Sequence, residues 1–183
     1  MEASITLKSL AKKFDNDIIL ADLSLGIESY SNHAIIGQNG AGKSTILKIL
    51  IGLIQKDAGV AYINGKDIST RESETKMVTG YMPQYIDLDT EMTVFENLMI
   101  FGTLYGVSKE SATKHILKFS EIFDYKDRLL EYPTELPTGT LRTVQFTRAM
   151  IHNPKILLLD EPTNGMDPRN KTRVWNILDT MGK

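Results

Sequence analysis

Residues 37–45 read Gly37-Gln38-Asn39-Gly40-Ala41-Gly42-Lys43-Ser44-Thr45 and match the phosphate-binding pattern G-x-x-x-x-G-K-[ST] at every fixed position. Residues 33–36 before it end in apolar side chains and indicate a buried strand, whereas residues 46–50 after it are typical of a helix. Glycines between a strand and a helix let backbone N–H groups approach phosphate oxygens, and the helix N-terminus adds partial positive charge. The sequence therefore predicts an α/β fold with a nucleotide site, where Lys43 reaches the outer phosphates and Ser44 ligates Mg²⁺.

The composition is that of an ordinary globular protein. Its 183 residues, 42% hydrophobic and 24% charged, suffice for one good core and a small second subdomain. With 21 Lys and Arg against 23 Asp and Glu, the net charge of −2 gives no electrostatic reason to expect nucleic acid. The absence of cysteine excludes disulfides, thiolate zinc sites and cysteine nucleophiles, and it permits a reducing cytoplasm.

The sequence predicts neither a secretory signal nor a membrane span. Residues 1–4 lack the basic region and apolar core of a signal peptide. Lys48, Gly52 and Gln55 interrupt the most apolar run, which stays short of the roughly 18 residues of a spanning helix. Any membrane role is therefore expected to come through a partner chain.

Short strands are predicted on both sides of the phosphate loop. Alternating apolar residues at 23–27 indicate a strand, and Asp15-Asn16-Asp17 supplies a turn before it. Further along, Asn64-Gly65 predicts a hairpin, because both turn positions require positive φ. Residues 78–82 indicate another strand, which ends at Pro83-Gln84.

From residue 92 to 131 the apolar pattern becomes helical. One apolar stripe follows Ser108, a plausible N-cap, and we interpret its aromatic members as core rather than as a base-stacking surface. Its members are Ala112, Ile116, Phe119, Ile122 and Phe123. A loop at 131–137 precedes a second helical pattern, and Asp167-Pro168 starts a helix that runs to about Met181.

Two acidic residues, Asp160 and Glu161, directly follow the apolar run 156–159. This run predicts a strand buried on both faces of a parallel sheet, whose carboxyl edge is where open α/β folds bind ligands. Asp160 is suited to hold the magnesium shell, often through water, and Glu161 to orient the water that attacks the γ-phosphate. An acidic pair alone is more often a solvated strand end, so the inference depends on the phosphate loop.

The order of these motifs resembles the nucleotide-binding subunits of ATP-binding-cassette (ABC) proteins over essentially the whole chain. Residues 37–45 resemble that family's Walker A motif, and Gln84 resembles its Q-loop glutamine. The strand ending in Asp160-Glu161 resembles Walker B with the catalytic glutamate, and residues 164–167 resemble the D-loop. The resemblance implies a P-loop NTPase core with a parallel sheet, a small antiparallel β subdomain and an inserted helical subdomain.

The resemblance also implies one ATP-binding domain over residues 1–183. The core with its β subdomain would comprise residues 1–84 and 150–183, and the helical subdomain residues 85–149. ATP and Mg²⁺ are the implied cofactors. The implied catalytic residues are Glu161, Lys43 and Gln84, and the implied metal ligands are Ser44, Gln84 and Asp160. The implied nucleotide-binding residues are Gly37 to Thr45, Gly139, and Phe14 stacking on adenine, although Phe14 can also be read as core.

Three segments, at 80–84, 92–110 and 135–139, resemble the drug- and lipid-exporting branch of the family. In that branch an ATPase chain pairs with a separate transmembrane permease subunit. The expected partners are therefore such a permease and a second nucleotide-binding subunit, identical or different, without nucleic acid. The implied location is cytoplasmic, peripheral at the inner face of the cell membrane, with Gln84 and the helices after it coupling nucleotide state to the permease.

The sequence departs from the family at the signature motif and at two further positions. The usual LSGGQ is replaced by Leu136-Pro137-Thr138-Gly139-Thr140, a segment that in family dimers clamps the γ-phosphate bound to the opposite subunit. Gly139 and the helix dipole remain, whereas Thr138 adds a Cβ where backbone approach matters. Thr143 replaces a frequent arginine, and Tyr30 stands where a glycine is usual.

The family's switch histidine has no equivalent here. It follows the catalytic glutamate by about thirty residues, and only 183 − 161 = 22 residues follow Glu161. His33, His115 and His152 are interpreted as ordinary surface or loop residues. Without the strand that leads to the switch histidine, a central position of the sheet would be empty. We therefore expect a fragment of a longer protein, or else a naturally degenerate subunit.

Two other functions remain open from the sequence. One is a non-transport cassette ATPase of translation or DNA repair, although no second cassette, long coiled-coil insertion or basic surface is visible. The other is a regulatory subunit that binds ATP and hardly hydrolyses it, because its signature and switch are impaired.

Overall fold

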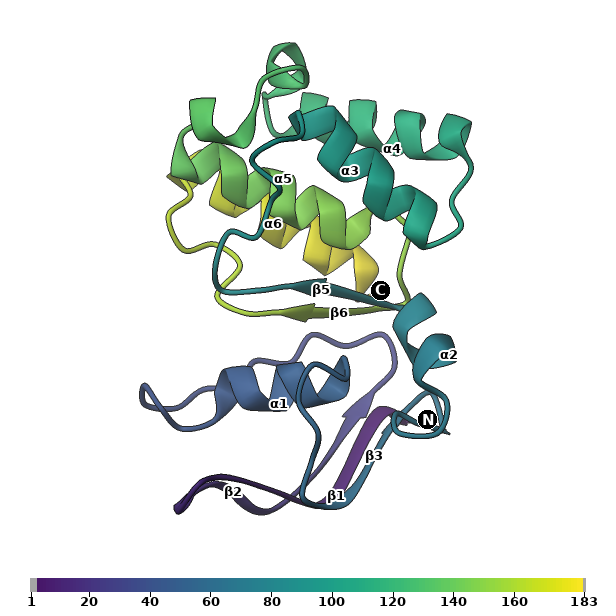
Figure 1. The fold of residues 1–183 in the computed structure, drawn as a ribbon, viewed down its shortest axis with the longest axis vertical. Helices are drawn as coiled ribbons and strands as arrows, with labels where there is room; N and C mark the ends of the chain where they lie inside the picture. Colours follow the sequence, from purple (N-terminus) through teal and green to yellow (C-terminus); the bar gives the residue numbers. More distant parts are fainter. Residues whose placement is uncertain (1–2, 183) are drawn as a thin grey trace. The chain divides into compact units, whose positions relative to one another are not determined.

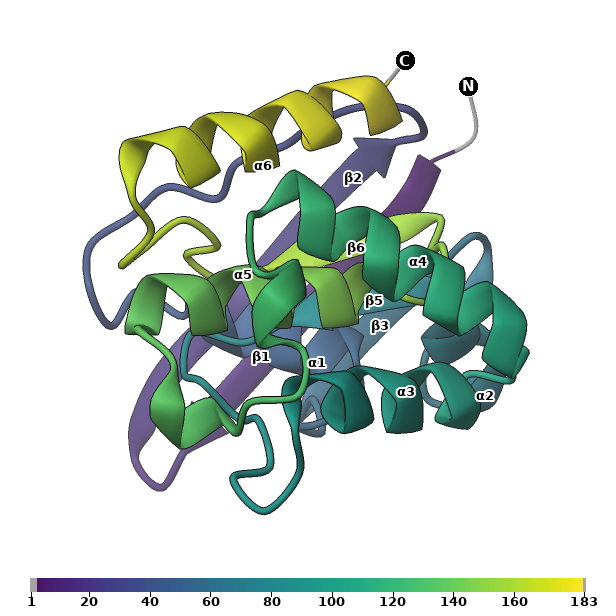
Figure 2. The same ribbon diagram turned by 90° about the horizontal axis from the view of Figure 1, so that it is seen from above.

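The computed structural model describes residues 3–182, which divide into two compact units. The first unit comprises the described residues up to Thr79 together with those from Leu178 onward. The second unit runs from Gly80 to Ile177. Figures 1 and 2 show the elements of both units from two directions.

The first unit is built on a long antiparallel hairpin. Strand β1 (Ala3–Phe14) pairs with β2 (Asp17–Glu28), with Phe14 opposite Asp17 and Ile5 opposite Ile27. The predicted turn is confirmed, since Asp15 has φ 50°. Strand β3 (Ala58–Ile63) pairs with the other edge of β1, and β4 (Lys66–Asp67) completes a sheet of order β2-β1-β3-β4.

The second predicted hairpin is also confirmed, because Asn64 and Gly65 both have positive φ, 48° and 72°. Ile5 and Leu7 alternate toward the core of the first unit, and Leu10 is buried there as well, after a register shift in the pairing of β1 with β2. The helix after the phosphate loop, α1 (Lys43–Leu50), buries Ile46, Ile49 and Leu50. A short helix, α2 (Glu72–Met77), follows β4 and was not predicted.

The strand predicted before the phosphate loop is not present in the structure. Residues 31–38 adopt no regular secondary structure, and the side chain of Ile36 is 92% exposed. No strand of the first unit's sheet pairs with residues 33–36, which therefore lack the ladder of hydrogen bonds that a strand requires. The expectation of a buried strand was therefore wrong, although the loop that it introduces forms as predicted.

Tyr30 has φ 57°, which lies in the left-handed region that favours glycine. The left-handed conformation costs an L-residue about 1–2 kcal/mol, and the exposed ring of Tyr30 gains little in return. We expect Tyr30→Gly to stabilise the chain by about 0.5–1 kcal/mol after the entropic cost of glycine. Urea unfolding would measure this, with Tyr30→Ala as the control that keeps the strain. Equal stability of the Gly and Ala variants would contradict the explanation.

The second unit contains strands β5 (Thr79–Met82) and β6 (Ile156–Leu159), which form a parallel pair. Helices α3 (Val94–Leu104), α4 (Lys109–Ile122) and α5 (Thr138–Met150) gather over this pair (Figure 1). Two single 3₁₀ turns, at Lys126–Arg128 and Pro133–Glu135, lie between α4 and α5. The final helix, α6 (Pro168–Met181), begins in this unit.

The helix boundaries follow from their caps. A capping box between Thr93 and Glu96 begins α3, and the hydroxyl of Ser108 accepts the backbone N–H of Ser111 at 3.3 Å, which confirms the predicted cap of α4. The carboxylate of Asp167 accepts the N–H of Asn170 at 3.0 Å and caps α6 as predicted. This bond from the Asn170 N–H is the main reason why the pKa of Asp167 lies below its usual range. Hydrogen bonds from the Asn170 side chain and the Arg169 N–H lower it further.

The apolar stripe of α4 is core, as predicted. Its residues Ala112, Ile116, Phe119 and Phe123 are buried, and the ring of Phe123 meets that of Phe146 on α5 edge-on at 5.7 Å. Strand β6 differs from its prediction, because Ile156 and Leu158 are buried whereas Leu157 and Leu159 are only partly covered. Among the described residues, no helix is both long and apolar enough to cross a membrane.

Candidate nucleotide-binding site

The phosphate loop has the backbone that its glycines predict. Gly42 is the N-cap of α1 with φ 85°, and Gly40 has φ 81°. A Cβ on Gly42 would lie 2.9 Å from Ile19 Cγ2 and 3.0 Å from Leu20 Cδ2 on β2. Position 42 therefore requires glycine for two reasons: its φ is positive, and a Cβ would clash with side chains of β2.

The N-terminus of α1 is open to an anion. Its N-cap residue has no side-chain acceptor, and the first turn contains no acidic residue. The N–H groups of Lys43, Ser44 and Thr45, at the start of the helix, therefore have no capping carboxylate to compete with a phosphate. The ammonium of Lys43 donates to the carbonyls of Gly37 at 2.9 Å and Gln38 at 2.7 Å, which holds the loop closed around its side chain.

Phe14 lies at the end of β1 in the same unit. Its ring is 44% exposed, and the ammonium of Lys12 lies 5.1 Å from the ring centroid. An aromatic face that is accessible at a strand end can stack on a base, which is the chemistry expected of this residue.

The acidic pair follows β6 in the second unit. Asp160 is 5% exposed, and its N–H donates to the carbonyl of Met82 on β5 at 2.9 Å. Its Oδ2 atom is buried without a hydrogen-bond partner among the described residues. A buried carboxylate oxygen needs a partner, and a magnesium ion or a water of its shell is of the right chemistry. The donor set at Asp160 therefore fits the expected metal.

Glu161, the next residue, differs from Asp160 in exposure and conformation. Its side chain is exposed, its φ is 48°, and its Oε2 accepts from Asn164 Nδ2 at 3.2 Å. Nearby, burial raises the pKa of Tyr81 to about 12, and the negative charges of Asp160 and Asp87 add to this effect. The pairing of β5 and β6 thus places neutral Tyr81 near Asp160.

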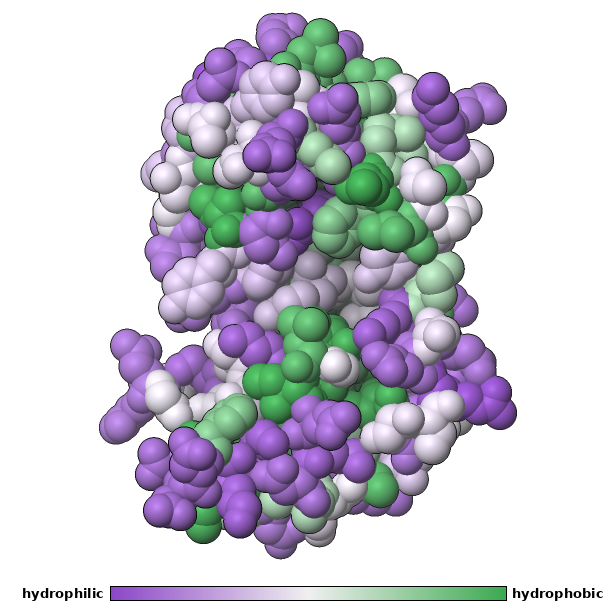
Figure 3. All heavy atoms as spheres, viewed as in Figure 1, coloured by the Kyte–Doolittle hydropathy of each residue, from purple (hydrophilic) through white to green (hydrophobic). Residues whose placement is uncertain are grey.

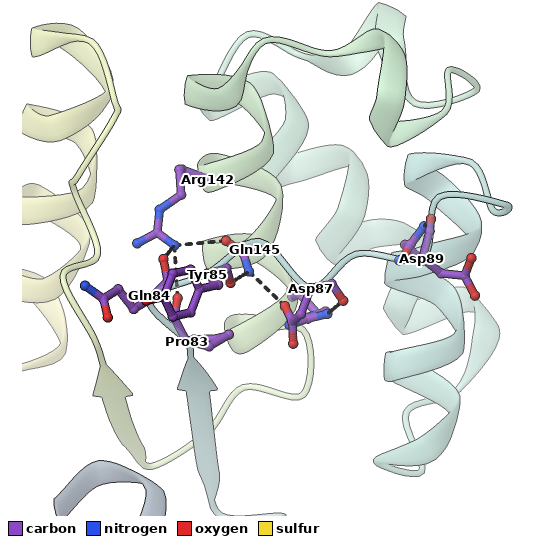
Figure 4. Close-up of polar contacts among 9 residues, drawn as sticks. Pro83, Gln84, Tyr85, Asp87, Asp89, Arg142 and Gln145 are labelled. Atoms are coloured by element: carbon purple, nitrogen blue, oxygen red, sulfur yellow. Dashed lines mark hydrogen bonds and ion pairs between the residues drawn. The ribbon is translucent and has the colours of Figure 1, made fainter. Parts of the chain in front are cut away.

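Gln84 follows β5 after Pro83, and its side chain is exposed. Figure 4 shows its amide pointing away from Gln145 and Asp87, whereas its main chain faces Arg142. The carbonyl of Gln84 accepts from Arg142 Nη1 at 3.0 Å. The side chain of Gln84 is therefore available for a ligand, while Arg142 holds its backbone in place.

The altered signature segment forms the start of α5. Pro137 is the N-cap without a side-chain acceptor, and the first turn contains no acidic residue. A Cβ on Gly139 would lie 3.0 Å from the carbonyl oxygen of Gly165 in the D-loop, so the two segments pack closely. Thr138 is exposed, whereas Thr143 is fully buried and donates its hydroxyl to the carbonyl of Thr140 at 2.7 Å.

Within the described residues, no three His, Asp or Glu side chains gather closely enough to hold a metal by themselves. Magnesium is often bound by one or two protein groups together with substrate phosphates. The arrangement around Asp160 is of that kind rather than a protein-only cage.

Sequence analysis missed a polar stripe on α5. Arg142, Gln145 and Arg148 are all at least 95% buried, and Asp87 receives hydrogen bonds from the last two. Their spacing of three residues places them on one helix face, and this periodicity was the available signal.

The histidines are only partly as expected. His33 is exposed, with its ring 2.9 Å from the hydroxyl of Ser31. His115 lies within α4, half-buried, and its Nδ1 is 2.9 Å from the carbonyl of Ile151. His152 stacks on Tyr105 with ring centroids 3.9 Å apart. His115 is thus only partly at the surface, and its contact joins α4 to the residue that follows α5.

Comparison with known proteins identifies the family. A family model described as ABC transporter matches residues 20–164. The Nod factor export ATP-binding protein I of Burkholderia lata is 33% identical over 182 residues, which are 98% of this chain and 59% of that protein. The protein of the same name from Rhizobium sp. is 33% identical over 177 residues, 97% of this chain and 58% of that protein. The chain thus spans about three fifths of the length of these relatives.

A solved structure described as the ATP-binding subunit of an ABC transporter superposes with a TM-score of 0.90 at 26% identity. The match covers 97% of this chain and 74% of that one. The motif order, the phosphate loop and these matches lead to one conclusion: the chain belongs to the ABC transporter family, as an ATP-binding domain with the P-loop NTPase fold.

Proposed function

We propose that this chain binds MgATP and hydrolyses it to power an ABC transporter of the exporting kind. The observation that carries the proposal is the phosphate loop, with left-handed Gly40 and Gly42 and an uncapped α1 N-terminus. The relatives named as Nod factor export proteins support the direction of transport. The molecule transported would be selected by the partner that spans the membrane.

The phosphate loop supplies the binding energy for ATP. Lys43 would exchange its two loop carbonyls for oxygens of the β- and γ-phosphates, and the N–H groups at the start of α1 would donate to the same phosphates. Phe14 would stack on adenine. Ser44, Gln84 and Asp160 would hold Mg²⁺, which when bound neutralises charge on the phosphate oxygens.

Glu161 would act as the general base for hydrolysis. Its exposed carboxylate can accept a proton from the attacking water, and Asn164 orients that carboxylate through Oε2. Gln84 would orient the same water or contact the metal. Gly139 lies at the start of α5. The N–H groups at this helix N-terminus would bind the γ-phosphate of ATP held by a second nucleotide-binding subunit.

The expected partners are a transmembrane permease and that second subunit. Figure 3 shows hydrophobic side chains on the surface over α3, where Ile100 is 43% and Leu104 71% exposed. Exposed apolar side chains of this kind suit contact with another protein. We further propose that residues 1–84 and 150–183 act as the ATP-binding core and 85–149 as the helical subdomain, at the inner face of the cell membrane.

Binding of MgATP should raise the melting temperature of the chain. At a hundredfold excess over the dissociation constant the gain is about 2.7 kcal/mol, or about 5–11 °C for a chain of this size. We expect Lys43→Ala to abolish this shift with little change in the melt without nucleotide. Lys48→Ala, in the same helix, is the matched control that keeps the shift. A wild-type chain whose melt ignores MgATP would contradict the proposal.

A further inference from the structure

The buried polar stripe of α5 holds two loops that carry proposed site residues. Arg142 is 3% exposed, Gln145 is fully buried and Arg148 is 5% exposed. Their acceptors lie in residues 83–87, directly after β5, and in residues 160–161, directly after β6. Burying a guanidinium is costly, so its contacts should account for its presence.

Arg142 contacts the main chain of both loops. Its Nη1 atom donates to the carbonyl of Pro83 at 2.9 Å and to that of Gln84 at 3.0 Å (Figure 4). Its Nη2 atom donates to the carbonyl of Glu161 at 2.7 Å and more weakly to that of Asp160 at 3.4 Å. The planar guanidinium thus bridges two segments whose nearest contacted residues, Gln84 and Asp160, are 160 − 84 = 76 positions apart in the sequence.

The acceptors of Arg142 are all carbonyl or amide oxygens. The fifth is Gln145 Oε1 at 3.0 Å, and Gln145 in turn donates to the carbonyl of Tyr85 at 2.7 Å and to Asp87 Oδ1 at 2.8 Å. Burial lowers the pKa of Arg142, while the charges of Asp160, Glu161 and Asp87 act in the opposite direction. Arg142 therefore does not form a simple ion pair but holds main-chain carbonyls of the two loops in place. We call this set of contacts the Arg142 brace.

At Glu161 the brace holds a strained backbone conformation. This residue has φ 48°, a conformation that costs an L-residue energy unless its surroundings hold it. The carbonyl of Glu161 accepts from Arg142 Nη2 at 2.7 Å and from the N–H of Asn164 at 3.1 Å. Two donors thus fix the backbone from which the Glu161 carboxylate projects.

We propose that Arg142 is a positioning residue, which holds the backbones of Gln84 and Glu161 in one fixed relation so that both side chains reach bound nucleotide together. This inference rests on the proposed function. Arg142 itself does not touch the nucleotide, and it acts on turnover through the two loops. Replacing an arginine that served folding alone would lower stability, but it would not lower kcat selectively while KM for ATP stayed the same.

The test compares Arg142→Lys and Arg142→Met with wild type in a preparation that hydrolyses ATP. Lysine keeps the charge, but one ammonium cannot bridge carbonyls of both loops. We expect both variants to lose at least tenfold in kcat, because small misplacements of reacting groups are costly, while KM for ATP stays within about twofold. Arg173→Met, which breaks an ion pair with Asp124 at 2.7 Å in the same unit, is the control that keeps kcat.

Hydrogen exchange on the chain without nucleotide gives an independent readout. We expect Arg142→Lys to speed exchange in residues 83–87 and 160–164 together, with the rest of the second unit unchanged. Faster exchange in one loop only, or a wild-type kcat in Arg142→Lys, would overturn the inference. If the wild-type protein binds no ATP, the proposed function fails, whereas coupled exchange of the two loops would still support the brace.

Discussion

Replacing Glu161 by glutamine is expected to lower ATP turnover by at least about a hundredfold, which is the usual contribution of a general base. Glutamine keeps the size of the side chain and an oxygen that can accept from Asn164 Nδ2, now 3.2 Å from Glu161 Oε2. It cannot take a proton from water. Nucleotide binding depends on the phosphate loop, so the MgATP shift in melting temperature should persist.

The measurement is steady-state phosphate release in a preparation that hydrolyses ATP. Glu110→Gln, an exposed carboxylate on α4, is the matched control and should keep wild-type turnover. Turnover of Glu161→Gln within twofold of wild type would show that the general base is assigned to the wrong residue. Wild-type protein that binds ATP but does not hydrolyse it would instead favour the regulatory alternative.

The second large effect is expected on stability, from Gly80→Ala in β5. A Cβ at this position would lie 2.1 Å from the carbonyl oxygen of Ala149 on α5, and 2.8 Å from Leu157 Cδ2 on β6. A backbone atom cannot turn away as a side chain can, so α5 must move off the strand. We expect a loss of about 3 kcal/mol or more, which corresponds to a fall of about 6–12 °C in melting temperature.

Thermal unfolding of the chain would measure this loss. Gly26→Ala is the matched control, because a Cβ there meets nothing within 4 Å and its φ is not positive. The control should melt within a degree or two of wild type. If Gly80→Ala destabilised the chain by less than 1 kcal/mol, the close approach of α5 to β5 would be wrong.

Local patterns predicted the hairpins, the helix caps and the phosphate loop. In each case the decisive interactions lie within a few residues, as in the left-handed pair Asn64-Gly65 or the cap of α4 by Ser108. The strand at residues 33–36 was mispredicted, because apolar composition indicates a preference for burial, whereas a strand also needs a partner to pair with.

By itself, the sequence determined that this is an ABC ATP-binding domain, because its motifs are contiguous and each carries its own chemistry. It also placed the acidic pair directly after a strand. Only the tertiary structure decided what holds that pair, since Arg142 on α5 meets Gln84 across 58 positions of sequence and Glu161 across 19. Such a contact depends on how a helix lies over two strands. A local sequence pattern does not determine this, because the contacting residues are far apart in the sequence.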